Sequence, residues 1–181
     1  MGCIVFAPPS TTDAVHVGFF ARSASAVVLS SAESGEKNSR ADRRLSRSLG
    51  DLHDKIVYAL DADDTEEAAK LLKLALKTIR RSKTLADDDR AEWYLIETRV
   101  EFARKRLPRG MLAAMRLVIL LPDHPRVPEA LVWVARGYED LDRPTKAIEL
   151  YEECLSKKNL DSITKMNART SLERLRNKVS Q

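Results

Sequence analysis

The chain of 181 residues is long enough for one compact domain with its own hydrophobic core. Hydrophobic residues make up 44% of it, which allows such a core, whereas 6% aromatic residues and 6 glycines count against β-sandwiches and barrels. The formal net charge of +4 is small and the charges are interspersed, so a nucleic-acid partner is not required. No run of about 18 apolar residues occurs, so we expect no membrane span.

The first 45 residues differ in composition from the rest of the chain. They are rich in serine and small residues, and the polar segment 33–44 is interpreted as a linker. We expect a disordered tail or sequence from a misplaced start codon, with a targeting segment as the alternative. Gly2 and Cys3 favour lipidation, but Phe6 stands where the myristoylation pattern requires serine or threonine.

From residue 46 onward the hydrophobic pattern is helical, and residues 46–181 are expected to form one helical domain. The first two predicted helices cover 46–60 and 65–82, with apolar residues at spacings of three and four. Asp64, followed by Glu67 three residues later, predicts a capping box at the start of the second helix.

The third predicted helix follows the acidic segment 86–89 and ends near residue 106. The segment 107–110 then breaks the chain. A fourth helix over 110–121 is almost entirely apolar, so we expect it to be covered on most sides. Three further helices are predicted at 128–141, 144–157 and 162–178.

The apolar face expected for the last of these helices includes Ile163 and Met166. Its other apolar positions are Ala168, Leu172 and Leu175. Because the connections between successive helices are short, we expect antiparallel hairpins stacked side by side in an all-α fold.

A repeat is visible when Ala147 and Tyr151 are used as anchors. A shift of 34 residues takes them back to Ala113 and Leu117, which also lie in a predicted helix. The same spacing, extended by Cys154, recurs at Ala68, Leu72 and Ala75. We therefore expect three hairpins of one design, with extra residues between the first two.

The segment 128–161 resembles a unit of the tetratricopeptide repeat (TPR) family. The residues that fall on the packing positions of that family are Leu131, Val134, Ala135, Tyr138, Ala147, Tyr151 and Cys154. Asn159 departs from the pattern, which has a proline there, and Pro125 supplies that proline one unit earlier. Small residues let two helices approach closely, while large ones fill the gap beside them. The resemblance covers about residues 46–161 and implies an α-solenoid of about three units with a capping helix.

This resemblance implies a concave surface made by the first helix of each hairpin, where TPR proteins typically bind a peptide or a partner helix. The residues expected to line this groove are Glu92, Arg99, Glu129, Val132 and Arg136. The resemblance therefore implies a non-catalytic adaptor or scaffold whose partner is another protein. Self-association through the apolar fourth helix is a further expectation.

The second predicted helix carries a basic stripe, which consists of Lys70, Lys73, Lys77 and Arg80. A second basic cluster occupies residues 104–109. A solvated helix surface explains both groups, and an acidic peptide or a phosphate backbone is the ligand that they would otherwise bind. No aromatic residue interleaves with them, which counts against stacking of single-stranded nucleic acid. A nucleic-acid-associated helical-repeat protein is the alternative function.

No recognisable catalytic motif occurs along the chain. The acidic turn 61–64 lacks the glycine that a calcium loop requires, and we interpret it as a helix start. His16, His53 and His124 are scattered, and two cysteines cannot form a zinc site. We expect no enzymatic activity, no cofactor and no bound metal.

We expect a cytoplasmic protein, with a periplasmic or organellar location as the alternative if residues 1–45 are a targeting segment. The segment 124–155 also resembles the TPR hairpins of bacterial periplasmic assembly factors. Envelope assembly is therefore a further alternative function.

Overall fold

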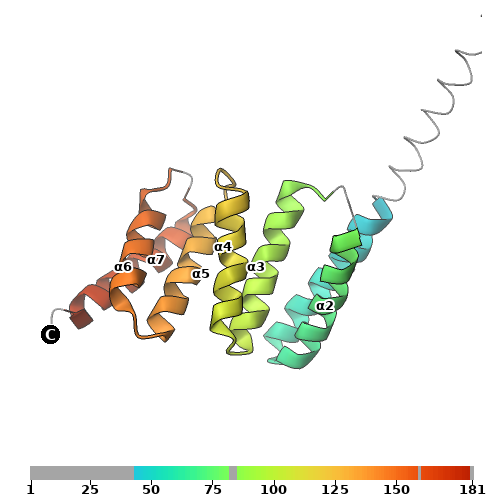
Figure 1. Ribbon diagram of the computed structural model, residues 1–181, viewed down its shortest axis with the longest axis horizontal. Coiled ribbons are helices and arrows are strands. Elements are labelled where there is room, and N and C mark those ends of the chain that lie inside the picture. Colours follow the sequence, from blue (N-terminus) through green and yellow to red (C-terminus); the bar gives the residue numbers. More distant parts are fainter. Residues whose placement is uncertain (1–42, 82–84, 159, 180–181) are drawn as a thin grey trace, which may run out of the picture. The chain divides into compact units, whose positions relative to one another are not determined.

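The computed structural model describes residues 43–81, 85–158 and 160–179 (Figure 1). The described helices are residues 43–61, α2 (Thr65–Arg81), α3 (Asp87–Ala103), α4 (Leu107–Leu120), α5 (Val127–Asp140), α6 (Pro144–Ser156) and α7 (Ser162–Val179). The described residues contain no strand, which confirms the predicted all-α fold. The expectations for Gly2, Cys3, His16 and the N-terminal tail lie outside these residues.

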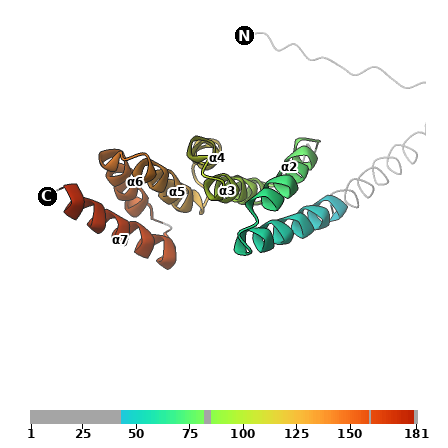
Figure 2. The ribbon, with the colours of Figure 1, turned by 90° about the horizontal axis from the view of Figure 1, so that it is seen from below.

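The helices of the unit Arg44–Gln181 pair into stacked hairpins. Figure 2 separates them into two layers, which we call the inner layer (residues 43–61, α3, α5 and α7) and the outer layer (α2, α4 and α6). One hydrophobic cluster is formed by residues 43–61, α2 and α3. A second cluster is formed by the five helices from α3 through α7. Since α3 contributes to both clusters, it couples the first hairpin to the rest of the array.

The helix starts follow from local chemistry. A proline stands in the first turn of α4, α5 and α6, where its missing N–H has no intrahelical partner to lose. One half of the predicted capping box of α2 is confirmed, because the Glu67 backbone N–H donates to Asp64 Oδ1 at 3.0 Å. The reciprocal half is not formed, since the Asp64 backbone N–H donates to the Ala59 carbonyl and the Glu67 carboxylate accepts from Lys70. Residues 107–110, predicted as a break, instead form the first turn of α4, and α3 ends at Ala103 rather than near residue 106.

All three hairpins close with the same three-residue turn. Its middle residue has a left-handed backbone in each case, with φ of 58° at Asp63, 58° at Lys105 and 52° at Asp142. In each turn this residue and the next one donate backbone hydrogen bonds back to the preceding helix, as in Lys105 N to Phe102 O (2.9 Å) and Arg106 N to Glu101 O (2.8 Å). This pair of bonds is a Schellman motif, which satisfies the last carbonyls of a helix.

The turns correct the predicted repeat register. Lys105 and Asp142 are 37 residues apart, so Ala147 corresponds to Gly110 and not to Ala113 as a shift of 34 predicted. The residues five positions after the turn centres are Ala68, Gly110 and Ala147, and all three are buried. The predicted correspondence of Ala68 with Ala147 therefore holds. That of Ala113 was wrong because α4, α5 and the connection between them make the repeat 37 residues long rather than 34.

Two predictions about burial were wrong. On α7 the buried stripe is Thr164, Ala168, Leu172 and Leu175, whereas Ile163 and Met166 are exposed. The apolar helix α4 is not covered on most sides, because Leu112, Ile119 and Leu120 are more than half exposed. Helix α4 belongs to the outer layer, so only the face toward α3 and α5 is covered.

Candidate functional site

The inner layer carries a groove made of two adjoining hollows, which we call the inner groove. The first hollow, of about 580 Å³, is lined by the end of the helix over residues 43–61 and by α3, α5 and α7. The second, of about 590 Å³, lies between α5, α7 and the loop before α5. Both hollows share Trp133 and Arg136, so the groove is continuous across these two side chains.

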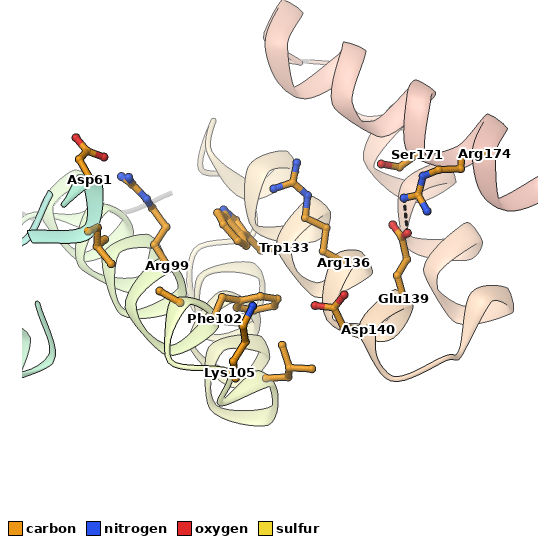
Figure 3. Close-up of a pocket in the computed structure, with 13 residues that line it drawn as sticks. Asp61, Arg99, Phe102, Lys105, Trp133, Arg136, Glu139, Asp140, Ser171 and Arg174 are labelled. Atoms are coloured by element: carbon orange, nitrogen blue, oxygen red, sulfur yellow. Dashed lines mark hydrogen bonds and ion pairs between the residues drawn. The ribbon is translucent and has the colours of Figure 1, made fainter. Parts of the chain in front are cut away.

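The floor of the groove is aromatic at its centre. The rings of Phe102 and Trp133 meet edge to face with 5.1 Å between their centroids. The guanidinium carbon of Arg136 lies 5.2 Å from the centroid of the Trp133 ring. Figure 3 shows Trp133 between Arg99 and Arg136, whose side chains extend to the same side of it. A cation held over an aromatic ring in a hollow can bind an anionic group with an apolar neighbour.

The two arginines occupy equivalent places in successive hairpins. Arg99 and Arg136 each lie six residues before a turn centre, and the apolar Val57 takes this place in the first hairpin. Neither arginine forms an ion pair or hydrogen bond with any residue in the described part of the chain. The groove therefore presents two guanidinium groups, one repeat apart, whose donors are open to a ligand.

The predicted acidic groove residues are already engaged within the protein. Glu129 lines the second hollow and accepts from Arg126 Nη2 at 2.9 Å. Glu92 lines neither hollow and instead pairs with Arg126 and, at 3.0 Å, with His53 Nε2. These bonds connect the helix over residues 43–61, α3 and the loop before α5. Val132 lines the second hollow but is only 6% exposed. It therefore shapes the wall of the hollow and offers a ligand little contact area.

A polar cluster around the buried Tyr151 hydroxyl fixes one wall of the first hollow. The Tyr151 hydroxyl donates to Glu139 Oε1 at 2.5 Å, and Arg174 pairs with the other oxygen of Glu139. Burial, followed by the hydrogen bond to Glu139, raises the pKa of Tyr151 well above its usual range. Because the cluster joins α5, α6 and α7, it holds the last helix against the third hairpin.

Cys154 is a structural residue of the same region. Its thiol is fully buried and donates to the Pro128 carbonyl at 3.4 Å. Burial, and then the nearby Asp161 and Glu153 carboxylates, raise the pKa of Cys154 to about 11. A thiol held neutral in this way does not act as a nucleophile near neutral pH.

The predicted basic stripe is only partly brought together. Lys73, Lys77 and Arg80 line a hollow of about 680 Å³ between α2, α3 and the start of α4, whereas Lys70 pairs with Glu67 outside it. The opposite wall of this hollow carries Arg104, Arg106 and Arg109 from the second predicted cluster. We call this hollow the basic groove.

Trp133, Phe102, Glu139 and Arg174 were not predicted as site residues. The sequence does contain one signal for Trp133 as a site residue. Arg136 follows it by three positions, a spacing that places a cation beside the aromatic ring on a helix surface.

Each histidine in the described residues lies within hydrogen-bond distance of a carboxylate. His53 contacts Glu92, and His124 Nε2 lies 2.9 Å from Asp88 Oδ1. No group of three or more histidine, cysteine, aspartate or glutamate side chains with metal-binding geometry occurs among the described residues. The same residues include no helix that is both long and apolar enough to cross a membrane.

Comparison of the sequence with models of known protein families finds no match, and no curated protein matches it.

Proposed function

We propose that this protein is a non-catalytic adaptor that binds an acidic segment of a partner protein in the inner groove. The observation that carries the proposal is the pair of equivalent arginines, Arg99 and Arg136, open to a ligand on either side of Trp133. Carboxylates of the ligand would accept from the two guanidinium groups, and an apolar side chain between them would lie on the indole. Since the arginines are one repeat apart, the ligand would span the second and third hairpins.

The cations at the centre of the groove that have no ion-pair partner in the described residues favour an acidic ligand. In the first hollow Glu139 is neutralised by Arg174, which leaves Arg99, Lys105 and Arg136 against Asp61 and Asp140. In the second hollow Arg126 neutralises Glu129, and the Asp161 carboxylate accepts from the backbone N–H groups of Ile163 and Thr164. Basic and acidic side chains therefore balance over the two hollows, and the guanidinium groups beside Trp133 are where a carboxylate would be attracted and fixed.

We further propose that the hairpins are TPR-like units, of which the third is the nearest to the family pattern. The burial of Ala147, Tyr151 and Cys154 supports this assignment, as does the recurring turn geometry. The spacing of 37 residues between the last two turns departs from the unit length of about 34 in that family. This kind of stacking favours peptide binding in a groove that the first helices of the hairpins form.

The non-catalytic role is proposed from the chemistry of the groove. Its open polar groups include two guanidinium groups, which stay protonated and therefore bind charge without exchanging protons at neutral pH. The one thiol in the described residues, that of Cys154, is buried outside the groove with a raised pKa. These groups suit recognition better than group transfer or hydrolysis.

Selection from a random peptide library displayed on phage tests the proposal. The full chain is the bait, beside the double variant Arg99→Glu, Arg136→Glu and a matched control, Lys165→Glu, Arg169→Glu, which reverses two exposed charges on α7. We expect the wild type and the control to enrich peptides with aspartate or glutamate next to an apolar residue. Enrichment of the same peptides by the groove variant would contradict the proposal.

A further inference from the structure

We propose that the basic groove is a second binding site, which takes an acidic, partly apolar peptide segment on the face opposite the inner groove. This inference does not depend on the proposed function, because none of the residues that line the basic groove lines the inner groove. It rests on three features of the basic groove: its charge, the length of α2 and a buried carboxylate.

Positive charge is concentrated in this one hollow. Six basic and two acidic side chains line it, which gives a net charge of +4, equal to that of the whole chain. Among the basic residues, Arg104 is engaged by Glu66 at 3.1 Å. Lys73, Lys77, Arg106 and Arg109 form no ion pair with any residue that the structure describes. Close cations of one sign repel each other, so an anionic ligand would relieve a repulsion that the free protein retains.

The groove follows from a difference in length between the outer helices. Helix α2 has 17 residues, whereas α4 has 14 and α6 has 13. When the three outer helices are aligned at the turn centres that precede them, α2 extends about one helical turn beyond α4 and α6. Arg80 lies in this extra turn. Helix α2 also packs less extensively on α3 than α4 does on α5. The first outer helix therefore stands apart from the second one and leaves a lined hollow over α3.

The walls of the hollow are partly apolar, and its acidic side chains are partly or fully buried. Ala69, Leu72 and Leu76 of α2 line it beside the cations. Burial raises the pKa of Glu97 above its ordinary value of 4.5, although the adjacent Arg116 guanidinium opposes that rise. Charge interactions near such buried groups are stronger than in open solvent. The hollow fits a ligand that carries apolar side chains together with acidic ones.

A buried acceptor distinguishes a peptide from a phosphate backbone. Glu101 lines the hollow at 9% exposure, and its Oε2 atom is buried without a hydrogen-bond partner in the described part of the chain. A buried carboxylate oxygen requires a donor, and a peptide backbone offers N–H groups. A DNA phosphodiester backbone offers no donor, and Glu101 would repel it. We therefore assign the groove to a peptide in which carboxylates meet the cations and a backbone N–H meets Glu101.

Fluorescence anisotropy with dye-labelled ligands tests this assignment. The ligands are a short peptide of alternating glutamate and leucine, a peptide of alternating glutamate and serine, and a single-stranded oligothymidylate. All measurements use the full chain with Arg99→Glu, Arg136→Glu, so that the inner groove does not contribute. On this background we add Lys77→Glu, Arg109→Glu in the basic groove or, as the matched control, Lys165→Glu, Arg169→Glu on α7.

We expect the glutamate–leucine peptide to bind more tightly than the glutamate–serine peptide. The basic-groove variant should weaken its binding about tenfold or more, while the α7 control changes it little. Glu101→Leu should also weaken the peptide, because it removes the acceptor for the backbone N–H. Equal binding to the groove variant and the control would overturn the assignment. If the oligothymidylate binds more tightly than either peptide, and Glu101→Leu strengthens its binding further, the assignment is overturned in favour of a nucleic-acid backbone.

Discussion

The guanidinium of Arg136 lies over the ring of Trp133, one helical turn earlier on α5, at 5.2 Å from the ring centroid. The same ring meets Phe102 of α3 edge to face. Trp133 therefore connects two hairpins and also fixes the position of a cation in the groove. A cation–π contact of this kind contributes about 0.5–1 kcal/mol at a partly exposed site.

Replacing this ring should weaken ligand binding. We expect Trp133→Leu to lower the affinity for a peptide selected by the inner groove about tenfold, since the floor is lost and Arg136 is no longer held. Isothermal titration calorimetry measures this change. Tyr138→Leu is the matched control, because Tyr138 carries Lys146 in a similar contact at 5.6 Å but lines neither hollow. Equal losses in both variants would show that Trp133 acts on stability alone.

Two glycines should respond to alanine in opposite directions. A Cβ at Gly110 would lie 2.4 Å from Phe102 Cδ2 and 3.3 Å from the backbone oxygen of Thr98, whereas one at Gly50 would meet nothing within 4 Å. We expect Gly110→Ala to destabilise the protein by about 1–3 kcal/mol through overpacking. Gly50→Ala should stabilise it by about 0.5–1 kcal/mol, because alanine favours the helix.

Urea unfolding followed by circular dichroism measures both glycine variants. Phe102→Leu in the Gly110→Ala background should recover part of the lost stability, because it withdraws the ring that the new methyl group meets. Stabilisation by Gly110→Ala would contradict the close packing of α4 on α3.

The turn residues offer a second pair of opposite effects. Lys105 has a φ of 58°, a conformation that glycine adopts without strain and lysine does not. We expect Lys105→Gly to raise the free energy of unfolding by about 0.5–1 kcal/mol. The same substitution at Lys165, an exposed helical residue of α7, should lower it by about 1 kcal/mol. If both variants lose stability, the left-handed turn is not formed in solution.

The buried hydroxyl of Tyr151 should make stability depend on alkaline pH. Its pKa is raised in the folded protein, so its contribution is complete below the ordinary value of 10.0 and is lost as the pH rises above that value. At neutral pH, Tyr151→Phe should cost about 1–3 kcal/mol, because Glu139 loses a buried donor. Above pH 10.0 the wild type should lose stability faster than the variant, which narrows that difference.

Chemical denaturation at a series of pH values measures the two curves. Cys154, whose pKa is also raised, is present in both proteins and cancels in the comparison. Tyr58→Phe is the control, because Tyr58 is 77% exposed and should leave stability unchanged. A constant difference between the wild type and Tyr151→Phe at all pH values would contradict the raised pKa.

Helix positions were predictable because apolar spacing and start signals are local. Pro144 and Asp64 mark helix starts in the sequence, and α2, α6 and α7 lie within one residue of their predicted bounds. The hairpin register was not predictable, because the turn centres are two aspartates and a lysine rather than glycine. Without glycine as a marker, the shift of 34 residues placed Ala113 where the structure has Gly110.

The charged site residues were partly predictable and the aromatic ones were not. Arg99 and Arg136 follow from their place on the first helices of the hairpins, and both line the groove. Glu92 also lies on the first helix of a hairpin. Its contacts with His53 and Arg126 come from neighbouring elements, which the pattern of a single helix does not show. Trp133 has the spacing of a core residue, so only the packing of α5 against α3 reveals it as a groove floor.

The most direct test of the central claim uses the two tryptophans as internal reporters. Trp133 lines the inner groove, whereas Trp93 is buried in the other core cluster at 5% exposure. The full chain, labelled with ¹⁵N, is titrated with a peptide enriched by the library selection, and the two indole N–H signals are followed by NMR. If the inner groove is the binding site, the Trp133 signal shifts in proportion to saturation and the Trp93 signal stays in place. Saturation of binding with the Trp133 signal unmoved would contradict the claim.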